Sequence, residues 1–219
     1  MPIRVLPDHV VSKIAAGEVV ERPASVVKEL IENAIDAGAG AIEVEARNGG
    51  KSFIRVVDDG CGVPRGEVEL AFHRHATSKL TTAEDLERIT TLGFRGEALA
   101  SIAAVSRMTF VTRAQDEAVG THLRLENGEI LACREVGRPS GTAVTVENLF
   151  FNVPARRKFL RTDRTERRHI ERSRGATVAG EWAAAGRAGR RVRARRGRKG
   201  TGDCSPRSAL WRHPRVRFG

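Results

Sequence analysis

A glycine-flanked loop directly before a predicted helix is the stretch of this sequence whose residues most clearly suggest a chemistry. It reads Leu92-Gly93-Phe94-Arg95-Gly96-Glu97-Ala98-Leu99, and the helix continues with Ile102 and Ala103 as apolar positions. Backbone N–H groups at the start of a helix have no partner within it, and glycines leave them accessible, so the loop suits phosphate oxygens. A flexible loop with a poor N-cap is the alternative interpretation.

Acidic and amide side chains stand out at two further places. Asp58 begins the run Asp58-Asp59-Gly60-Cys61-Gly62, which follows a predicted strand, so a carboxylate would lie at the mouth of a sheet. Glu29 and Asn33 are four residues apart and would share one face of a helix. Both patterns also have a plain interpretation, because Asp and Gly after a strand usually form a turn and a polar helix face is usually solvated.

Periodic patterns along residues 1–172 predict the elements that would position these groups. Residues 21–38 have apolar side chains at three- and four-residue spacings and end in Gly38, which predicts an amphipathic helix. A last helix is predicted over 163–172. Alternating patterns predict strands at 41–46, 53–57, 108–113, 121–125, 130–134 and 142–147. Helices gathered against a largely antiparallel sheet make an α+β fold, a two-layer sandwich.

The basic charge of the chain is concentrated near its end. The 219 residues carry 38 Lys and Arg against 27 Asp and Glu, a net charge of +11. Residues 173–219 hold thirteen of the basic and two of the acidic residues, so residues 1–172 are neutral overall. This tail is rich in Arg and Gly and lacks apolar periodicity, which predicts a disordered segment.

Two further interpretations of residues 173–219 remain open. An arginine-rich segment can bind nucleic acid. Arg, Gly, Ala and Pro are also the residues of GC-rich codons, so a shifted reading frame in a GC-rich gene would give the same composition. We favour the frameshift because the resemblance described below ends abruptly where the net charge rises from zero to +11. We divide the chain into a domain at 1–172 and a tail at 173–219.

Other features limit the class of protein. The sequence has no apolar run of about eighteen residues, the length that a membrane-spanning helix needs. Its start lacks the layout of a secretory signal, and Cys61, Cys133 and Cys204 have neither the spacing of a zinc site nor an even number. We therefore expect a cytosolic protein with ordinary thiols and no membrane partner.

The order of the motifs resembles the N-terminal ATPase region of the MutL family of DNA mismatch repair proteins. MutL belongs to the GHKL superfamily, together with gyrase B subunits, histidine kinases and the ninety-kilodalton heat-shock chaperones. The run from Ile14 to Leu30 resembles the MutL version of the first ATP motif, and the run from Phe151 to Leu160 resembles MutL rather than the other branches. The remaining ATP motifs are matched by Asp58 to Gly62, His75 to Lys79 with Gly93 to Leu99, and Gly141-Thr142.

The resemblance covers residues 1–172 and implies the GHKL, or Bergerat, ATP-binding fold with ATP and Mg2+ as cofactors. Glu29 would be the general base that deprotonates the water attacking the γ-phosphate, and Asn33 would bind Mg2+. Hydroxyls and a cation near the phosphates would come from Thr77, Ser78 and Lys79. The lid loop that closes over the phosphates would consist of Gly93, Phe94, Arg95 and Gly96.

The same resemblance assigns the adenine pocket. Asp58 would accept a hydrogen bond from the adenine amino group, which selects against guanine because guanine carries an oxygen there. Gly60 and Gly62 would allow the base to approach closely, and Thr142 would line the pocket. Family members often have Asn where this chain has Asp59.

The family implies partners as well. Closure of the lid around ATP would drive homodimerisation and signalling between mismatch-recognition and strand-processing proteins. DNA would be a further partner, and the protein would act in the bacterial cytosol, near the nucleoid. A lysine from a second domain would reach the γ-phosphate, and residues 1–219 hold no such domain. We therefore expect the chain as written to bind nucleotide weakly, to hydrolyse it poorly or not at all, and to fold with low stability. The alternatives are another GHKL ATPase and a nucleic-acid-binding protein that acts through the Arg-rich tail.

Overall fold

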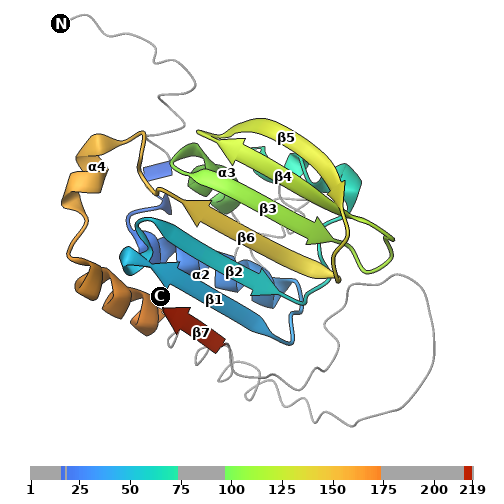
Figure 1. The fold of residues 1–219 in the computed structure, drawn as a ribbon, viewed down its shortest axis with the longest axis horizontal. Helices are drawn as coiled ribbons and strands as arrows, with labels where there is room; N and C mark the ends of the chain where they lie inside the picture. The colour runs from blue at the N-terminus through green and yellow to red at the C-terminus, as the bar shows by residue number, and fades with distance from the viewer. Residues whose placement is uncertain (1–15, 18, 74–96, 174–214, 219) are drawn as a thin grey trace, which may run out of the picture.

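The chain folds into a layer of helices packed on one face of a β-sheet. A computed structural model describes residues 16–17, 19–73, 97–173 and 215–218. Within these residues seven strands form one sheet, and helices α2 and α3 lie behind it in the view of Figure 1. The predicted α+β two-layer sandwich is therefore confirmed.

Helix α2 (Pro23–Asp36) is the long helix of this layer. Pro23 stands in its first turn, where the missing N–H costs nothing, and Gly38 follows its end with a φ of 69°. Five of the six apolar side chains predicted to share a face are buried against the sheet, and Ile35 is half-buried. The five are Val26, Val27, Leu30, Ile31 and Ala34. The helix thus starts and ends two residues inside the predicted range.

The strands lie close to their predicted ranges, but their order in the sheet is not their order in the sequence. They are β1 (Ile42–Arg47), β2 (Phe53–Asp58), β3 (Arg107–Arg113), β4 (Gly120–Glu126), β5 (Glu129–Val136) and β6 (Gly141–Glu147). The order across the sheet is β5-β4-β3-β6-β2-β1-β7, with every pair antiparallel except β1 and β7. Strand β6 therefore joins the hairpin of β1 and β2 to the meander of β3, β4 and β5.

Short helical segments complete the layer. Asn48–Gly50 (η1) forms the turn between β1 and β2, and Arg65–Glu67 (η2) and Leu70–Phe72 (η3) follow β2. Helix α3 (Ala98–Ala104) leads into β3 and buries Ile102 and Ala103, as its apolar pattern predicts.

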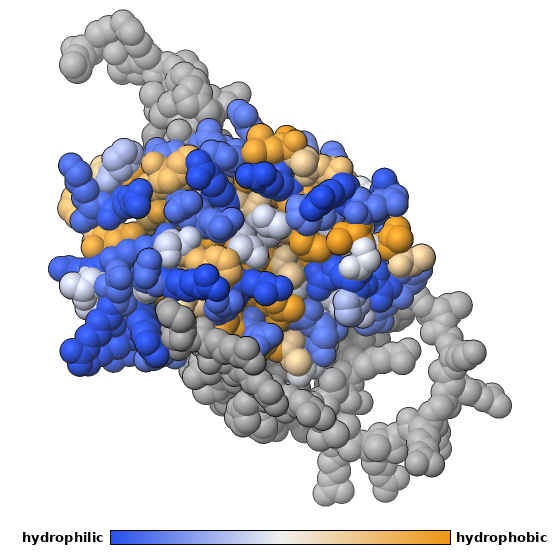
Figure 2. Space-filling model, viewed as in Figure 1, coloured by the Kyte–Doolittle hydropathy of each residue, from blue (hydrophilic) through white to orange (hydrophobic). Residues whose placement is uncertain are grey.

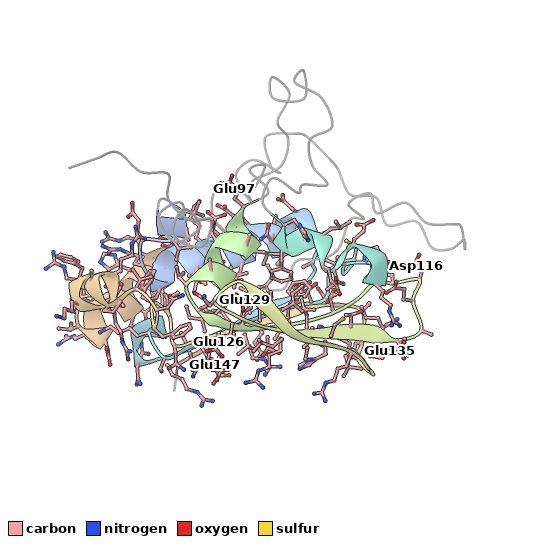
Figure 3. All side chains as sticks on the ribbon, turned by 90° about the horizontal axis from the view of Figure 1, so that it is seen from above. Glu97, Asp116, Glu126, Glu129, Glu135 and Glu147 are labelled. Carbon is pink, nitrogen blue, oxygen red and sulfur yellow. The ribbon has the colours of Figure 1, made fainter. Side chains whose placement is uncertain are left out.

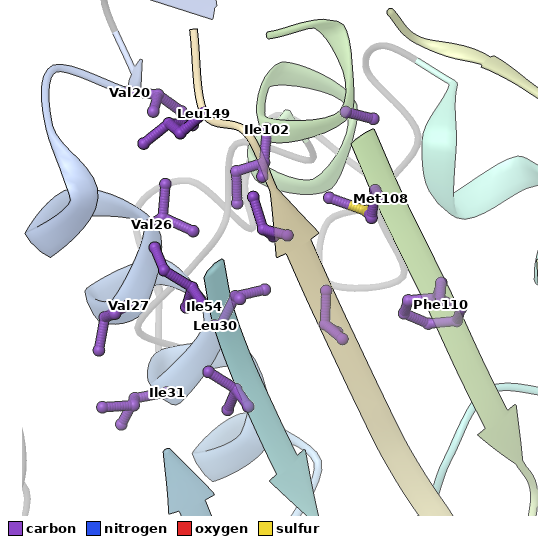
Figure 4. Close-up of a cluster of buried hydrophobic side chains, with 14 of the residues drawn as sticks. Val20, Val26, Val27, Leu30, Ile31, Ile54, Ile102, Met108, Phe110 and Leu149 are labelled. Atoms are coloured by element: carbon purple, nitrogen blue, oxygen red, sulfur yellow. The ribbon is translucent and has the colours of Figure 1, made fainter. Parts of the chain in front are cut away.

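The hydrophobic core lies between the helices and the sheet. Val26 and Leu30 of α2 face Ile54 of β2, and Ile102 of α3 faces Met108 of β3, as Figure 4 shows. Phe110 lies farther along β3, with 2% of its surface exposed, and the ring of Phe72 packs against it edge to face at 5.3 Å between centroids. This core holds α2 and the inner strands in fixed positions relative to one another.

The opposite face of the sheet is open to solvent and carries charged residues. Arg107 of β3 is in register with Glu126 of β4 and Glu147 of β6, and its Nε atom lies 3.2 Å from an oxygen of Glu126. Glu126 and Glu147 project away from the helices in Figure 3. The same face is a mixture of hydrophilic and apolar patches in Figure 2, as one face of a half-buried antiparallel sheet usually is.

The segment after β6 is helical in two parts. Helix α4 (Pro154–Phe159) is followed by helical residues 163–173, where the sequence predicts the last helix. This second helix is anchored by the buried side chain of Ile170 and by an ion pair of 2.7 Å between Asp163 and Lys51. It lies beside the β1 edge of the sheet in Figure 1.

One strand departs from the expectation of a disordered tail. Residues Arg215–Phe218 form β7, which pairs in parallel with Glu43 to Ala46 of β1. The outer edge of β1 offers backbone groups for pairing, and Arg-Val-Arg-Phe alternates charged with apolar residues, as strands do. An alternation of four residues is too short to recognise within an Arg-rich stretch.

Candidate active site

Helix α2 carries Glu29 and Asn33 on the same face, one turn apart. The side chain of Glu29 is 25% exposed, and Asn33 is half-buried. Lys28 lies between two carboxylates, with its Nζ atom 3.8 Å from Glu29 and 3.1 Å from Glu32. The site therefore has a carboxylate and an amide oxygen side by side, with a cation at one side of the carboxylate.

Asp58 ends strand β2 and is held by backbone amides. Its Oδ1 atom accepts hydrogen bonds from the N–H of Gly60 at 2.9 Å and from the N–H of Thr142 at 3.2 Å. Thr142 is directly opposite Asp58 in the pairing of β2 with β6. The structure thus brings together Asp58, Gly60 and Thr142, which lie up to 84 positions apart in the sequence.

Close approach explains two glycines of this loop. A Cβ on Gly60 would lie 2.9 Å from the carbonyl oxygen of Ala37 and 3.0 Å from Oδ1 of Asp58. Gly62 has a φ of 73°, and a Cβ there would clash with the backbone of Arg113. The lack of a side chain is therefore a requirement of packing against Ala37 and Asp58 at Gly60, and of packing against the backbone of Arg113 at Gly62.

Hydrogen bonds tie the Asp58 loop to the end of α2. The N–H of Cys61 donates to the carbonyl of Ala37 at 2.9 Å, and the N–H of Ala37 donates to the carbonyl of Asn33, also at 2.9 Å. The carboxylate of Asp59 accepts from the amides of Gly40 and Ala41 at 2.7 and 2.8 Å. These contacts place the helix that bears Glu29 and Asn33 next to the strand end that bears Asp58.

The environment of Asp58 raises its pKa from 3.8 to about 6. Burial is the main cause, because it disfavours the charged carboxylate. The amides of Gly60 and Thr142 and the positive charge of Arg138 lower the pKa, and the negative charge of Asp59 raises it slightly. At neutral pH the carboxylate is therefore ionised and can accept hydrogen bonds.

Arg138 was not predicted as a site residue. It precedes β6 and interacts electrostatically with Asp58, while its guanidinium donates to the carbonyls of Val111 and Pro139. A single Arg in a loop between strands gives no signal in the sequence, because its proximity to Asp58 depends on the placement of β6 beside β2.

A second residue that the sequence analysis missed is Thr112 on β3. Its hydroxyl contacts the hydroxyl of Thr142 at 3.0 Å and accepts from the N–H of Val63 at 2.9 Å. Its side chain is fully buried. A signal was present, since Thr112 continues the alternation of Met108 and Phe110 and so predicts a polar residue on the inner face of the strand.

Part of the predicted phosphate site cannot be placed. The residues predicted to contact the phosphates and to form the lid loop lie outside the described residues: Thr77, Ser78, Lys79, Gly93, Phe94, Arg95 and Gly96. The description resumes at Glu97, whose carbonyl oxygen accepts the N–H of Ser101 in the first turn of α3. The predicted lid residues therefore stay a prediction.

The donor set fits a magnesium ion held mainly by phosphates. Among the described residues there is no group of three or more His, Cys, Asp or Glu side chains that could hold a metal ion. Magnesium bound with a nucleotide typically takes one or two protein oxygens and several oxygens from phosphates and water. A single amide oxygen from Asn33 is consistent with that pattern.

Comparisons with known proteins show the family of the chain. Residues 21–136 match the family model described as "Histidine kinase-, DNA gyrase B-, and HSP90-like ATPase". The DNA mismatch repair protein MutL of Solibacter usitatus is 60% identical over 168 residues, which are 77% of this chain and 26% of that protein. MutL of Haemophilus influenzae is 54% identical over 172 residues, 78% of this chain and 27% of that protein. The chain thus spans about a quarter of the length of these relatives.

Solved structures give the same result. The ATPase domain of Aquifex aeolicus MutL complexed with ADP has a TM-score of 0.55 and 39% identity, covering 75% of this chain and 56% of that one. The N-terminal domain of a DNA repair protein has a TM-score of 0.62 and 32% identity, covering 77% and 48%. No helix among the described residues has the length and apolarity needed to cross a membrane. The chain belongs to the family of histidine kinase-, DNA gyrase B- and HSP90-like ATPases, and within that family it is similar to the ATPase domain of MutL.

Proposed function

We propose that this chain is the ATP-binding module of a MutL-type DNA mismatch repair protein. The observation that carries the proposal is the carboxylate of Asp58 at the end of β2, ionised at neutral pH and hydrogen-bonded to Gly60 and Thr142. It lies beside the helix that presents Glu29 and Asn33. In this proposal Asp58 of β2 accepts a hydrogen bond from adenine, and Glu29 of the neighbouring helix α2 accepts a proton from the attacking water.

The adenine end of the site consists of Asp58 and Thr142. One oxygen of Asp58 is occupied by two backbone amides, and the carboxylate keeps further acceptor positions for the amino group of adenine. Guanine presents a carbonyl oxygen at the same position. Two hydrogen-bond acceptors would then face each other, with no hydrogen atom between them. The site therefore favours ATP over GTP.

The hydrolytic end of the site consists of Glu29 and Asn33. Glu29 accepts a proton from the attacking water, and the Nζ atom of Lys28 lies 3.8 Å from its carboxylate. A magnesium ion held by Asn33 and the phosphates would neutralise charge on the phosphate oxygens. Contacts to the phosphates are assigned to Thr77, Ser78, Lys79 and the loop from Gly93 to Gly96, whose closure over ATP promotes homodimerisation.

The proposal extends to the role of the whole protein. The relatives are named as DNA mismatch repair proteins, so we propose DNA and the mismatch-recognition and strand-processing proteins as partners, in the bacterial cytosol near the nucleoid. Charge supports contact with DNA, because residues 154–172 carry eight basic and three acidic residues. For a polypeptide of just these 219 residues we propose slow hydrolysis, since the family's γ-phosphate lysine follows the matched region.

Calorimetric titration with ATP and GTP, each with Mg2+ and with EDTA, tests the proposal. We expect the chain to bind ATP more tightly than GTP and to lose that preference in Asp58→Asn. Binding of neither nucleotide, or equal binding of both by the unchanged chain, would contradict the proposed function.

The basic tail supports a second candidate, a nucleic-acid-binding protein that acts through residues 173–219. These residues carry the whole net charge of +11. DNA binding measured at two salt concentrations, with and without residues 173–219, separates the two functions. Binding that is lost with the tail favours this second candidate, and binding that survives its removal favours the surface of the folded domain.

A further inference from the structure

A row of polar side chains crosses the inner face of the sheet at its Asp58 end. Asp58 of β2 is opposite Thr142 of β6, Thr142 is opposite Thr112 of β3, and Thr112 is opposite Thr121 of β4. Because cross-strand partners point to the same face, all four belong to the helix-covered side. The three threonines are 9%, 0% and 4% exposed in that order, so their hydroxyls need partners inside the protein.

The hydroxyl of Thr112 has three neighbours within hydrogen-bond distance. The N–H of Val63 donates to it at 2.9 Å, the carbonyl oxygen of Gly141 lies at 3.2 Å, and the hydroxyl of Thr142 lies at 3.0 Å. A hydroxyl has a single proton to donate, and a carbonyl oxygen can only accept. All three contacts are satisfied together when Thr112 donates to Gly141 and accepts from both Val63 and Thr142.

This arrangement fixes the direction of the Thr142 hydroxyl. Its proton points to Thr112, so its lone pairs remain available as acceptors. The amide of the same residue donates to Asp58. Thr142 therefore links the buried hydroxyl of Thr112, which does not reach the proposed adenine pocket, to the carboxylate of Asp58, which does.

We infer that Thr112 is a positioning residue for base selection, because it orients the hydroxyl of Thr142 as a hydrogen-bond acceptor beside Asp58. This inference rests on the proposed function. Two acceptors at one end of the pocket, Thr142 and Asp58, suit a purine that presents an amino group there, directly or through a water. A purine that presents a carbonyl oxygen there, such as guanine, receives no hydrogen bond from either Thr142 or Asp58.

Thr112→Val tests the inference, since valine has nearly the shape of threonine and lacks the hydroxyl. Without Thr112 as its acceptor, the Thr142 hydroxyl can turn and donate to a guanine oxygen. We expect the ratio of GTP to ATP dissociation constants to fall about fivefold, the equivalent of one ordinary hydrogen bond. Thr112→Ser restores the hydroxyl and should restore the ratio.

Thr121→Val is the matched control, because Thr121 is buried in the same row one strand farther from Asp58. It should leave the nucleotide ratio unchanged. Amide hydrogen exchange without nucleotide gives an independent readout: the Val63 amide should exchange faster in Thr112→Val and at the normal rate in Thr112→Ser.

Three results would overturn the inference. They are equal weakening of ATP and GTP binding in Thr112→Val, a Thr112→Ser variant that behaves like Thr112→Val, and a Thr121→Val variant with the same loss of selectivity. Each of them leaves the proposed function standing. Failure of the unchanged chain to bind either nucleotide contradicts the proposed function itself and this inference with it.

Discussion

The guanidinium of Arg156 donates a hydrogen bond of 2.9 Å to the carbonyl oxygen of Val20, 136 positions earlier in the chain. The same group lies over the ring of Phe150 at 6.0 Å and fills the space where a side chain on Gly17 would be. Gly17 and Val20 belong to the first stretch that resembles MutL, and Arg156 belongs to the last. The two stretches most specific for MutL are therefore in direct contact.

Removal of the Arg156 side chain should destabilise the domain. Arg156→Ala loses the hydrogen bond to Val20 and the contact with Phe150, so the free energy of unfolding should fall by about 1–2 kcal/mol. Arg157→Ala is the control, because Arg157 is an exposed neighbour on α4 and its removal should cost less than about 0.5 kcal/mol. Urea unfolding measures both, and equal losses would show that the contact contributes nothing.

Asp58→Asn should make the domain more stable at neutral and higher pH. Folding raises the pKa of Asp58 from 3.8 to about 6, so the folded state favours the protonated carboxyl. The stability that this preference contributes is complete below pH 3.8 and is lost as the pH rises through 6. At pH 8 the charged carboxylate therefore costs about 3 kcal/mol. Thermal unfolding should show that Asp58→Asn is more stable than the unchanged chain at pH 8, and that this difference in stability disappears toward pH 4. A variant that is less stable at pH 8 would contradict the raised pKa.

Nucleotide affinity should depend on pH through the same group. Asp58 can accept a hydrogen bond from the adenine amino group when its carboxylate is ionised, so ATP affinity should fall as the pH drops below about 6. Titrations between pH 5 and pH 8 measure the midpoint. The weaker binding of Asp58→Asn should show no such midpoint, and a midpoint that persists in this variant would assign the titration to another group.

Asp59→Asn should be tolerated, because an amide oxygen can also accept from the backbone of Gly40 and Ala41. The substitution removes a negative charge that raises the pKa of Asp58, so the pH midpoint of ATP binding should move down. Asp59→Ala removes both hydrogen bonds, which are exposed to solvent, and should cost about 1 kcal/mol of stability. An unmoved midpoint in Asp59→Asn, or equal stability of the two variants, would go against this view.

Glu29→Gln should separate binding from hydrolysis. The amide keeps the shape of the side chain and cannot take a proton, so ATP turnover should fall about 100-fold or more while ATP affinity changes little. Glu21→Gln, an exposed position just before α2, should leave both unchanged. Single-turnover measurements with bound ATP compare the three proteins, and unchanged turnover in Glu29→Gln would exclude it as the base.

The sequence predicts elements well where the pattern is local. The spacing of Val26, Leu30 and Ile31 defines α2, and Gly38 marks its end, because both depend on residues within a few turns of each other. The strand alternations are recognisable for the same reason, since each shows which side chains face the core. The placement of Glu29 and Asn33 on one helix face follows directly.

What the local patterns do not contain is the neighbour of each strand. Nothing in Gly141–Glu147 indicates that β6 lies between β2 and β3, and that choice brings Thr142, Thr112 and Arg138 to Asp58. Partner choice depends on the packing of the whole sheet on α2 and α3. Arg138 was therefore missed. The alternation of its strand indicates that Thr112 faces inward, but its proximity to Thr142 and Asp58 depends on the position of β6.

The central position of β6 also determines when the site can exist during synthesis. Strands β1 to β5 precede β6 in the chain, and the inner edges of the β1–β2 pair and of the β3–β4–β5 meander, on β2 and β3, both take β6 as their partner. Until residues 141–147 emerge, those edges present unpaired amides and carbonyls, which are templates for wrong pairing. The pairing of β6 therefore covers both edges and brings Thr142 opposite Asp58 in a single step.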